Sequence, residues 1–279
     1  MNLPKIPIAS WIEALENWLQ SNFGPLFDVF RIAIGKTVNS IDAALNFLPP
    51  IVMIVLFALL AWYLGKWKMA VLTALGLLLI ENLGLWSQTM QTLALVVTAA
   101  FISVLIGVPI GILCSRSSKV QKIVTPILDF MQTMPAFVYL LPAITFFRLG
   151  VVPGVISSII FAIPPTIRLT NLGIRQVPDE LIEAADAFGS TPSQKLFKLQ
   201  LPLAMPTIMA GINQTIMLSL SMVVISSMIG AQGVGALVYR SVTQGKTGVG
   251  FEAGLAIVIL AIILDRMTQK VITKTKAQR

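Results

Sequence analysis

The sequence predicts an all-α protein that crosses a membrane about seven times. Hydrophobic residues make up 56% of the 279 positions and charged residues only 11%, whereas a soluble domain usually carries about 25% charged residues. The charges are also clustered, so they leave uncharged runs that approach the roughly 20 apolar residues a spanning helix needs. Lysine and arginine gather in alternate connecting segments, and this bias predicts an orientation.

Uncharged runs measure the spans, because a central Asp, Lys or Arg costs a spanning helix roughly 2.5–3.5 kcal/mol. The second and seventh runs are short and reach membrane length only if Glu81, Glu252 or Asp265 lies near the headgroups. We therefore expect seven spans, at about 48–65, 68–86, 90–114, 123–147, 150–169, 203–229 and 251–268.

The distribution of basic residues orients these spans. With the N-terminus outside, 14 of the 20 lysines and arginines fall on the inner side. The positive-inside rule then predicts an outer N-terminus, an inner C-terminus and an odd number of spans. Residues 170–202, which join the fifth and sixth spans, are accordingly expected in the cytoplasm.

Residues 1–47 are expected to form a separate amphipathic region. Apolar residues such as Trp11, Leu15 and Trp18 recur at three- and four-residue steps, with polar residues on the other face. Amphipathic helices with tryptophan on the apolar face typically lie along the membrane interface. We expect an extracytoplasmic or interfacial scaffold, broken at 22–25, and a transmembrane domain over 48–279.

The loop at 170–202 has the pattern of two short, capped helices. Pro178 suits a first helical turn, and acidic residues follow it where the positive end of the helix dipole favours them. Gly189 stands where a helix ends in a left-handed residue. Thr191 and Gln194 form a capping-box pattern that starts the second helix.

The first of these helices has an apolar face, made of Leu181, Ala184, Ala185 and Phe188 at helical spacing. Two alanines allow another backbone to approach closely, and the phenylalanine supplies an anchor. From the residues alone, docking into a soluble partner and packing on the protein's own bundle are equally open interpretations.

The same stretch, EAADAFGSTPSQKLFKLQLP, resembles the EAA loop of permease subunits in bacterial ATP-binding-cassette importers. The match rests on Glu183, Ala184, Ala185 and Gly189 at the family spacing, closed by Leu201 and Pro202. The resemblance implies that Glu183–Gly189, including Phe188, forms a coupling helix that seats in a separate ATPase subunit. It also implies a multi-pass protein of the bacterial cell membrane.

A closer resemblance covers nearly the whole chain. Residues 125–147, 150–178 and 210–235 are similar to the permeases of glycine betaine and proline betaine uptake systems, and the long N-terminal region fits that branch. The resemblance implies a permease homodimer, two ATPases that hold ATP and Mg²⁺, and an extracytoplasmic substrate-binding protein. No cofactor is expected on this chain. Carnitine, choline or proline remain alternative cargoes.

Several polar or helix-breaking residues within the spans are candidates for the translocation path. Helix breaks are tolerated in a membrane where freed carbonyls face protein or a cavity, and intramembrane ionisable groups usually face a bundle interior or water. Each residue could instead have a purely structural role. Asp129 could pair with a basic residue, and the others could form contacts between helices. The candidates are Asp129, Met134, Pro135, Tyr139, Asn213, Gln214 and Ser219. Pro164 and Pro165 are expected to interrupt the fifth span.

Other classes of function fit less well. The chain has no histidine, which removes Ser-His and Cys-His catalysis and the commonest transition-metal ligand, so we expect a transport subunit with no catalytic or metal site. An intramembrane enzyme would also need a close acidic pair within a span. An ion-gradient-driven carrier would not need an ATPase-docking loop and often shows inverted repeats. No phosphate-binding G-x-x-x-x-G-K-[ST] sequence occurs, and no nucleic-acid partner is expected.

Overall fold

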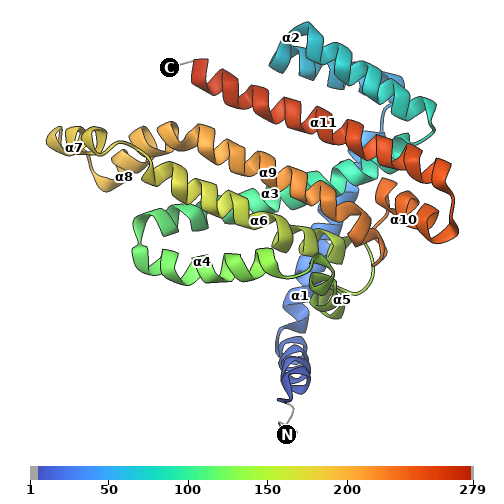
Figure 1. Ribbon diagram of the computed structural model, residues 1–279, viewed down its shortest axis with the longest axis horizontal. Coiled ribbons are helices and arrows are strands. Elements are labelled where there is room, and N and C mark those ends of the chain that lie inside the picture. Colours follow the sequence, from blue (N-terminus) through green and yellow to red (C-terminus); the bar gives the residue numbers. More distant parts are fainter. Residues whose placement is uncertain (1–5, 278–279) are drawn as a thin grey trace, which may run out of the picture.

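The protein is helical throughout residues 6–277, the part that the computed structural model describes, with no strand in that range. Most of the long helices run roughly along one direction, with short helices at either end of them (Figure 1). The elements are α1 (Ile8–Asn46), α2 (Pro50–Asn82), α3 (Trp86–Arg116), α4 (Ser118–Thr133), the 3₁₀ turn η1 (Ala136–Tyr139), α5 (Leu140–Phe147), α6 (Val151–Arg175), α7 (Asp179–Ala187), α8 (Pro192–Gln194), the π-helical turn η2 (Lys195–Gln200), α9 (Leu201–Ser227), α10 (Val234–Gln244) and α11 (Thr247–Ala277).

The centre of the bundle is built from α3, α6 and α9, which approach one another through small residues. On α3, Gly111 faces Thr170 of α6 so closely that an added Cβ would lie 2.5 Å from the Thr170 Cβ. On α9, an added Cβ at Gly211 would lie 3.0 Å from the Pro165 carbonyl oxygen of α6. Helices in membranes associate in this way because no hydrophobic effect drives them together, and close backbone packing takes its place.

Five helices are long and apolar enough to cross a membrane, or six if the bent pair α4–α5 is one span. We had expected seven. The difference comes mainly from α2, which covers most of both expected spans, 48–65 and 68–86, as two arms on either side of Lys66. The Lys66 backbone has φ +65°, outside the helical region. Each arm falls short of the roughly 20 residues that a span needs.

The expected span 123–147 is not a straight helix. Its two halves, Ser118–Thr133 and Ala136–Phe147, meet at an angle of 107°. The bend falls at Met134 and Pro135, as the proline predicted, because proline lacks the amide hydrogen that would continue the helix. By contrast, the expected interruption at Pro164–Pro165 is wrong: α6 continues through both residues. The Thr215 hydroxyl of α9 donates to the Ala162 carbonyl oxygen beside them, at 2.8 Å.

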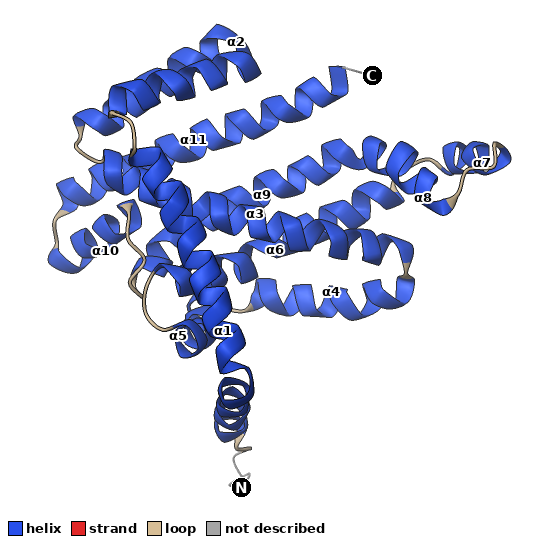
Figure 2. Ribbon diagram, turned by 180° about the vertical axis from the view of Figure 1, so that it is seen from behind, coloured by secondary structure: helices blue, strands red, loops and turns tan. Residues whose placement is uncertain are grey.

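The N-terminal region is one helix, α1, which crosses the direction of the bundle (Figures 1 and 2). The expected break at 22–25 is wrong, since the helix passes through Pro25. Gly24, next to it, has no neighbouring atom within 4 Å of an added Cβ, so solvent can reach the backbone group that the proline leaves unpaired. The buried residues of α1, Ile34 and Val38, lie in its second half, and Phe27 near its middle packs on Phe146 of α5. Burial in this second half raises the pKa of Asp42, and a hydrogen bond from Asn46 opposes the rise.

Candidate functional site

The loop between α6 and α9 folds as the sequence predicts. Helix α7 follows Pro178 and carries Asp179 and Glu180 in its first turn. It ends at Gly189, whose φ of +71° is the left-handed conformation that glycine adopts without steric cost. The Ser190 amide then donates to the Ala185 carbonyl oxygen at 2.9 Å. The C-terminal end of α7 is therefore fixed by local contacts, and acidic residues at its N-terminal end suit the helix dipole.

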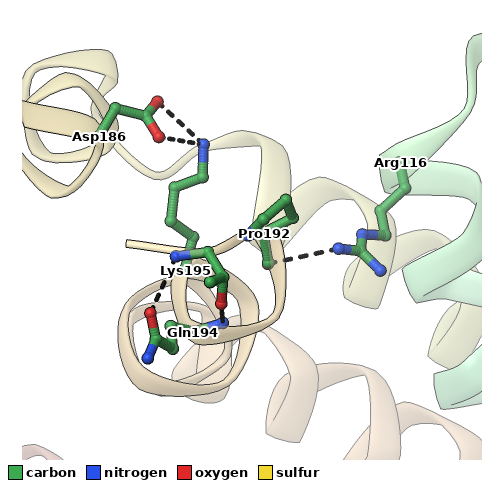
Figure 3. Close-up of polar contacts among 6 residues, drawn as sticks. Arg116, Asp186, Pro192, Gln194 and Lys195 are labelled. Atoms are coloured by element: carbon green, nitrogen blue, oxygen red, sulfur yellow. Dashed lines mark hydrogen bonds and ion pairs between the residues drawn. The ribbon is translucent and has the colours of Figure 1, made fainter. Parts of the chain in front are cut away.

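A capping box starts the second helix of the loop. The Gln194 amide donates to the Thr191 hydroxyl at 3.3 Å, and the Thr191 amide donates to the Gln194 side-chain oxygen at 2.8 Å. Lys195 reaches back to Asp186 of α7 with a nitrogen–oxygen distance of 2.6 Å. Arg116, at the end of α3, donates to the Pro192 carbonyl oxygen at 3.3 Å. Figure 3 shows that these contacts join α7, α8 and α3 around one corner of the loop.

Helix α7 projects beyond the bundle with no buried residue. The Phe188 side chain is 90% exposed and Leu181 is 42% exposed. Glu183, Ala184 and Gly189 are exposed as well, and Ala185 is half-buried. The apolar face is therefore largely exposed, although Leu181 lines a hollow that α9 also lines, and this exposure favours docking of another protein over packing on the protein's own bundle.

The break between α4 and α5 holds four of the candidate path residues. Met134 and Pro135 form the bend, half-buried and exposed respectively. Tyr139 is buried, and its hydroxyl donates to the Met131 carbonyl oxygen. Asp129 forms an ion pair with Arg168 of α6, at 2.6 Å between Arg168 Nη2 and Asp129 Oδ1. The expected alternative, a basic partner for Asp129, is present.

Two of the three candidates on α9 lie within the packed bundle. The Asn213 amide donates to Asp265 of α11 at 2.8 Å and accepts from the Thr268 hydroxyl at 2.6 Å, so it joins α9 to α11. Ser219 is fully buried, and its hydroxyl has no partner among the described residues. Gln214 is exposed. The structure thus favours helix contact for Asn213 and exposure on a surface for Gln214.

Comparison with known proteins settles the family. Residues 107–276 match the model of the binding-protein-dependent transport system inner membrane component. The chain belongs to this family. It is a multi-pass inner-membrane component, and its relatives are transport permease subunits of ATP-binding-cassette importers, not enzymes. Membership implies a membrane, an ATPase and a substrate-binding protein as partners.

Three relatives match this permease over nearly its whole length. The glycine betaine transport system permease protein OpuAB of Bacillus subtilis (strain 168) is 58% identical, over 99% of this chain and 98% of its own. The glycine betaine/carnitine transport permease protein GbuB of Listeria monocytogenes serotype 1/2a (strain 10403S) is 53% identical, over 99% of both. The glycine betaine/proline betaine transport system permease protein ProW of Escherichia coli (strain K12) is 51% identical, over 95% of this chain and 75% of its own.

The fold also matches a solved transporter. An inward-facing structure of the MetNI methionine ABC transporter aligns with a TM-score of 0.64 and 23% identity, covering 68% of this chain and 95% of that one. At this identity the match supports the helical fold alone. It is consistent with the all-helical class that the composition predicted.

Reasoning from the sequence missed two charged residues in these contacts. Arg168 is among the 14 basic residues that the positive-inside rule assigns to the inner side, and Asp265 is expected near the headgroups at the end of a span. Both lie inside long helices and pair across helices, Arg168 with Asp129 and Asp265 with Asn213. A charged residue several turns inside a predicted helix indicates that it needs a polar partner. Which residue is that partner depends on how the helices pack, and the sequence alone does not specify this packing.

Proposed function

We propose that this permease is the membrane subunit of an ATP-driven importer for glycine betaine or proline betaine, used in osmoprotection. The observation that carries the proposal is the identity of 58% to a glycine betaine permease over 99% of this chain and 98% of that one. The GbuB and ProW relatives, whose names include glycine betaine, support the same substrate.

The complex would contain two copies of the permease, two ATPase subunits and an extracytoplasmic binding protein. ATP and Mg²⁺ would be held by the ATPases, and this chain would need no cofactor. The N-terminal helix, α1, would serve as a scaffold at the outer interface. Its first half supports that role, since Trp11, Trp18 and Phe23 are exposed on an amphipathic helix.

Energy would enter through α7. The helix is held because Gly189 and the Ser190 amide close its C-terminal end and the Lys195–Asp186 ion pair ties it to the turn before α9. It connects directly to α6 on one side and, through α8, to α9 on the other, and these two helices are in backbone contact at Gly173 and Gly211. When two ATPases close, a force on α7 would therefore move α6 and α9 together. Such a movement can open a path on one side of the membrane while it closes the other.

The function is tested by reconstituting the permease with its partner ATPase and binding protein. We expect betaine uptake that requires ATP and stops when the ATPase is left out. Uptake that persists without the ATPase would contradict the importer assignment and favour an ion-gradient carrier. Uptake of another solute that excess glycine betaine and proline betaine do not reduce would overturn the substrate assignment alone.

The coupling role of α7 is tested with Phe188→Ala. Because this side chain is 90% exposed, its removal should leave the permease folded. We expect at least about a tenfold loss of affinity for the ATPase, as for an aromatic anchor at the centre of an interface, together with a loss of uptake. Phe47→Ala is the matched control, since Phe47 is 83% exposed but lies between α1 and α2. Normal ATPase binding by Phe188→Ala would contradict the assignment.

A further inference from the structure

Six exposed polar residues form a single stripe along α4. Each of them lies three or four residues from another member of the set, which places them on one face of the helix. The stripe begins at the first residue of α4 and reaches the break at Met134, while the opposite side of the helix packs on Cys114, Ile163 and Ile167. The residues of this polar stripe are Ser118, Lys122, Thr125, Asp129, Gln132 and Thr133.

The ion pair on this stripe lies inside the spanning part of the bundle. Arg175 donates to the Cys114 carbonyl oxygen at 3.0 Å, which aligns the ends of α6 and α3. Arg168 precedes Arg175 by two helical turns, and Asp129 follows Lys122 by two turns. At 1.5 Å per residue, Arg168 lies roughly 10 Å deeper in the bundle than Arg175, and Asp129 lies as much deeper than Lys122. The α6 and α4 helices thus independently place the ion pair at the same depth.

At that depth, the exposure of the pair excludes a position against lipid. The side chain of Asp129 is 58% exposed and that of Arg168 is 41% exposed. Charged groups within a membrane almost always face water or protein, because hydrocarbon cannot solvate them. Since the whole stripe is polar and exposed, the simplest arrangement is a water-filled passage that runs along α4.

The pair also keeps hydrogen-bonding capacity for a ligand. Arg168 and Asp129 share one contact, Nη2 to Oδ1, instead of the two parallel contacts that a guanidinium and a carboxylate can make. Arg168 Nε is buried and out of reach of a solute, but the Arg168 side chain is 41% exposed and gives only Nη2 to Asp129. Its exposed N–H groups can therefore donate to a second carboxylate, and the exposed Asp129 carboxylate can attract a cation.

We propose that Asp129 and Arg168 form a transient binding station for a zwitterion in the inner half of the translocation path. Arg168 holds the carboxylate of the solute and Asp129 faces its quaternary ammonium group. The site holds one positive and one negative charge, and a zwitterion brings one of each, so binding leaves the net charge of the site unchanged. The affinity for the solute therefore stays low, and a translocation path needs low affinity so that the solute can leave. This inference rests on the betaine importer proposed above.

The test compares Arg168→Gln with wild type in the reconstituted complex. The measured quantity is the number of betaine molecules taken up per ATP hydrolysed, with saturating loaded binding protein. We expect this ratio to fall about tenfold or more, the effect of losing one charge-assisted hydrogen bond to the moving solute, and Arg168→Lys to recover part of it. Arg31→Gln is the matched control, because Arg31 forms a similar exposed ion pair with Asp28 on α1, and it should keep the wild-type ratio.

A second variant separates the binding station from a purely structural clasp between α4 and α6. The double substitution Asp129→Asn with Arg168→Gln keeps a hydrogen-bonding pair but removes both charges, and we expect its ratio to stay low. A wild-type ratio in either Arg168→Gln or the double variant would overturn the inference. Absence of betaine uptake in the wild-type complex would instead defeat the proposed function, so the two failures are distinguishable.

Discussion

At the scale of single residues, side-chain hydroxyls supply the donors that prolines remove. A proline leaves the carbonyl four residues before it without an amide partner. Pro135 has this effect on Met131, and the Tyr139 hydroxyl donates to that carbonyl oxygen instead. An unpaired carbonyl inside a membrane costs several kcal/mol. The bend between α4 and α5 is therefore held in one geometry by a buried tyrosine.

Tyr139→Phe removes this donor and keeps the ring. We expect the free energy of unfolding of the complex in detergent to fall by about 1–3 kcal/mol, the effect of leaving a buried acceptor unsatisfied, and betaine uptake to fall with it. Thermal unfolding and uptake measure the two effects. Tyr239→Phe is the control, because the Tyr239 ring is half-buried outside this contact. Equal effects of the two substitutions would contradict the role of the Tyr139 hydroxyl.

At this scale, contacts between residues close together in the chain could be predicted from the sequence, and contacts between distant residues could not. The cap at Gly189 and the capping box of Thr191 and Gln194 are local, so the residues alone specified them, and the structure confirms both. The partners of Asp129 and Asn213 lie on other helices, 39 and 52 positions away. No local pattern encodes such a pairing, because it depends on the rotation and depth of each helix.

At the scale of helices, the packing of α3 against α6 depends on two glycines one turn apart, Gly107 and Gly111. An added Cβ at Gly111 would lie 2.8 Å from the Ile167 carbonyl oxygen, which belongs to the backbone and cannot turn aside. An added Cβ at Gly107 would meet the Thr166 methyl at 2.9 Å. The separation of the two helices is therefore set by the absence of side chains.

We expect Gly111→Ala to destabilise the permease by about 1–3 kcal/mol, the usual effect of overpacking a filled interface. The alanine would separate α3 from α6 and so disturb α4, which packs on both. Thermal unfolding of the purified permease measures the loss. Gly254→Ala on α11 is the control, since nothing lies within 4 Å of its added Cβ. There alanine should be neutral or stabilising by up to about 1 kcal/mol. A neutral Gly111→Ala would contradict the close-packing argument.

Hydropathy located the long helices α3, α6, α9 and α11, but it did not predict where a helix bends. The expected span 90–114 falls within α3, and the expected span 203–229 overlaps α9, which ends at Ser227. The spans 48–65 and 68–86 became one broken helix because Lys66 adopts a non-helical backbone. Prolines were ambiguous: Pro135 marks a bend of 107°, whereas Pro25 and Pro164 lie inside continuous helices. Pairing of the freed carbonyl does not decide the outcome, because the Met131 carbonyl before the bent Pro135 is paired with the Tyr139 hydroxyl.

At the scale of the whole molecule, the two ends of the bundle differ in charge and in shape. One end carries α7, α8 and the end of α11, and the turn between α3 and α4 lies toward it (Figure 1). The opposite end carries α10 and its connections, with the cross-running α1 nearby (Figure 2). Many of the described lysines and arginines gather at the α7 end, among them Arg116, Lys119, Lys122, Arg175, Lys195 and Lys198. The positive-inside rule therefore predicts that this end lies in the cytoplasm, where an ATPase is available.

This orientation can be tested by labelling with a membrane-impermeant thiol reagent. The sequence has one cysteine, Cys114, whose side chain is 2% exposed. A Cys114→Ala variant has no thiol to react with the reagent, so single cysteines can be added to it and labelled one at a time. We expect Lys246→Cys, between α10 and α11, to react in intact cells. Lys119→Cys, at the start of α4, should react only after the membrane is permeabilised. Both positions are exposed, so a difference reports the side of the membrane and not burial. The reverse pattern would place α7 outside the cell, where it could not reach an ATPase, and would overturn the coupling assignment together with the orientation.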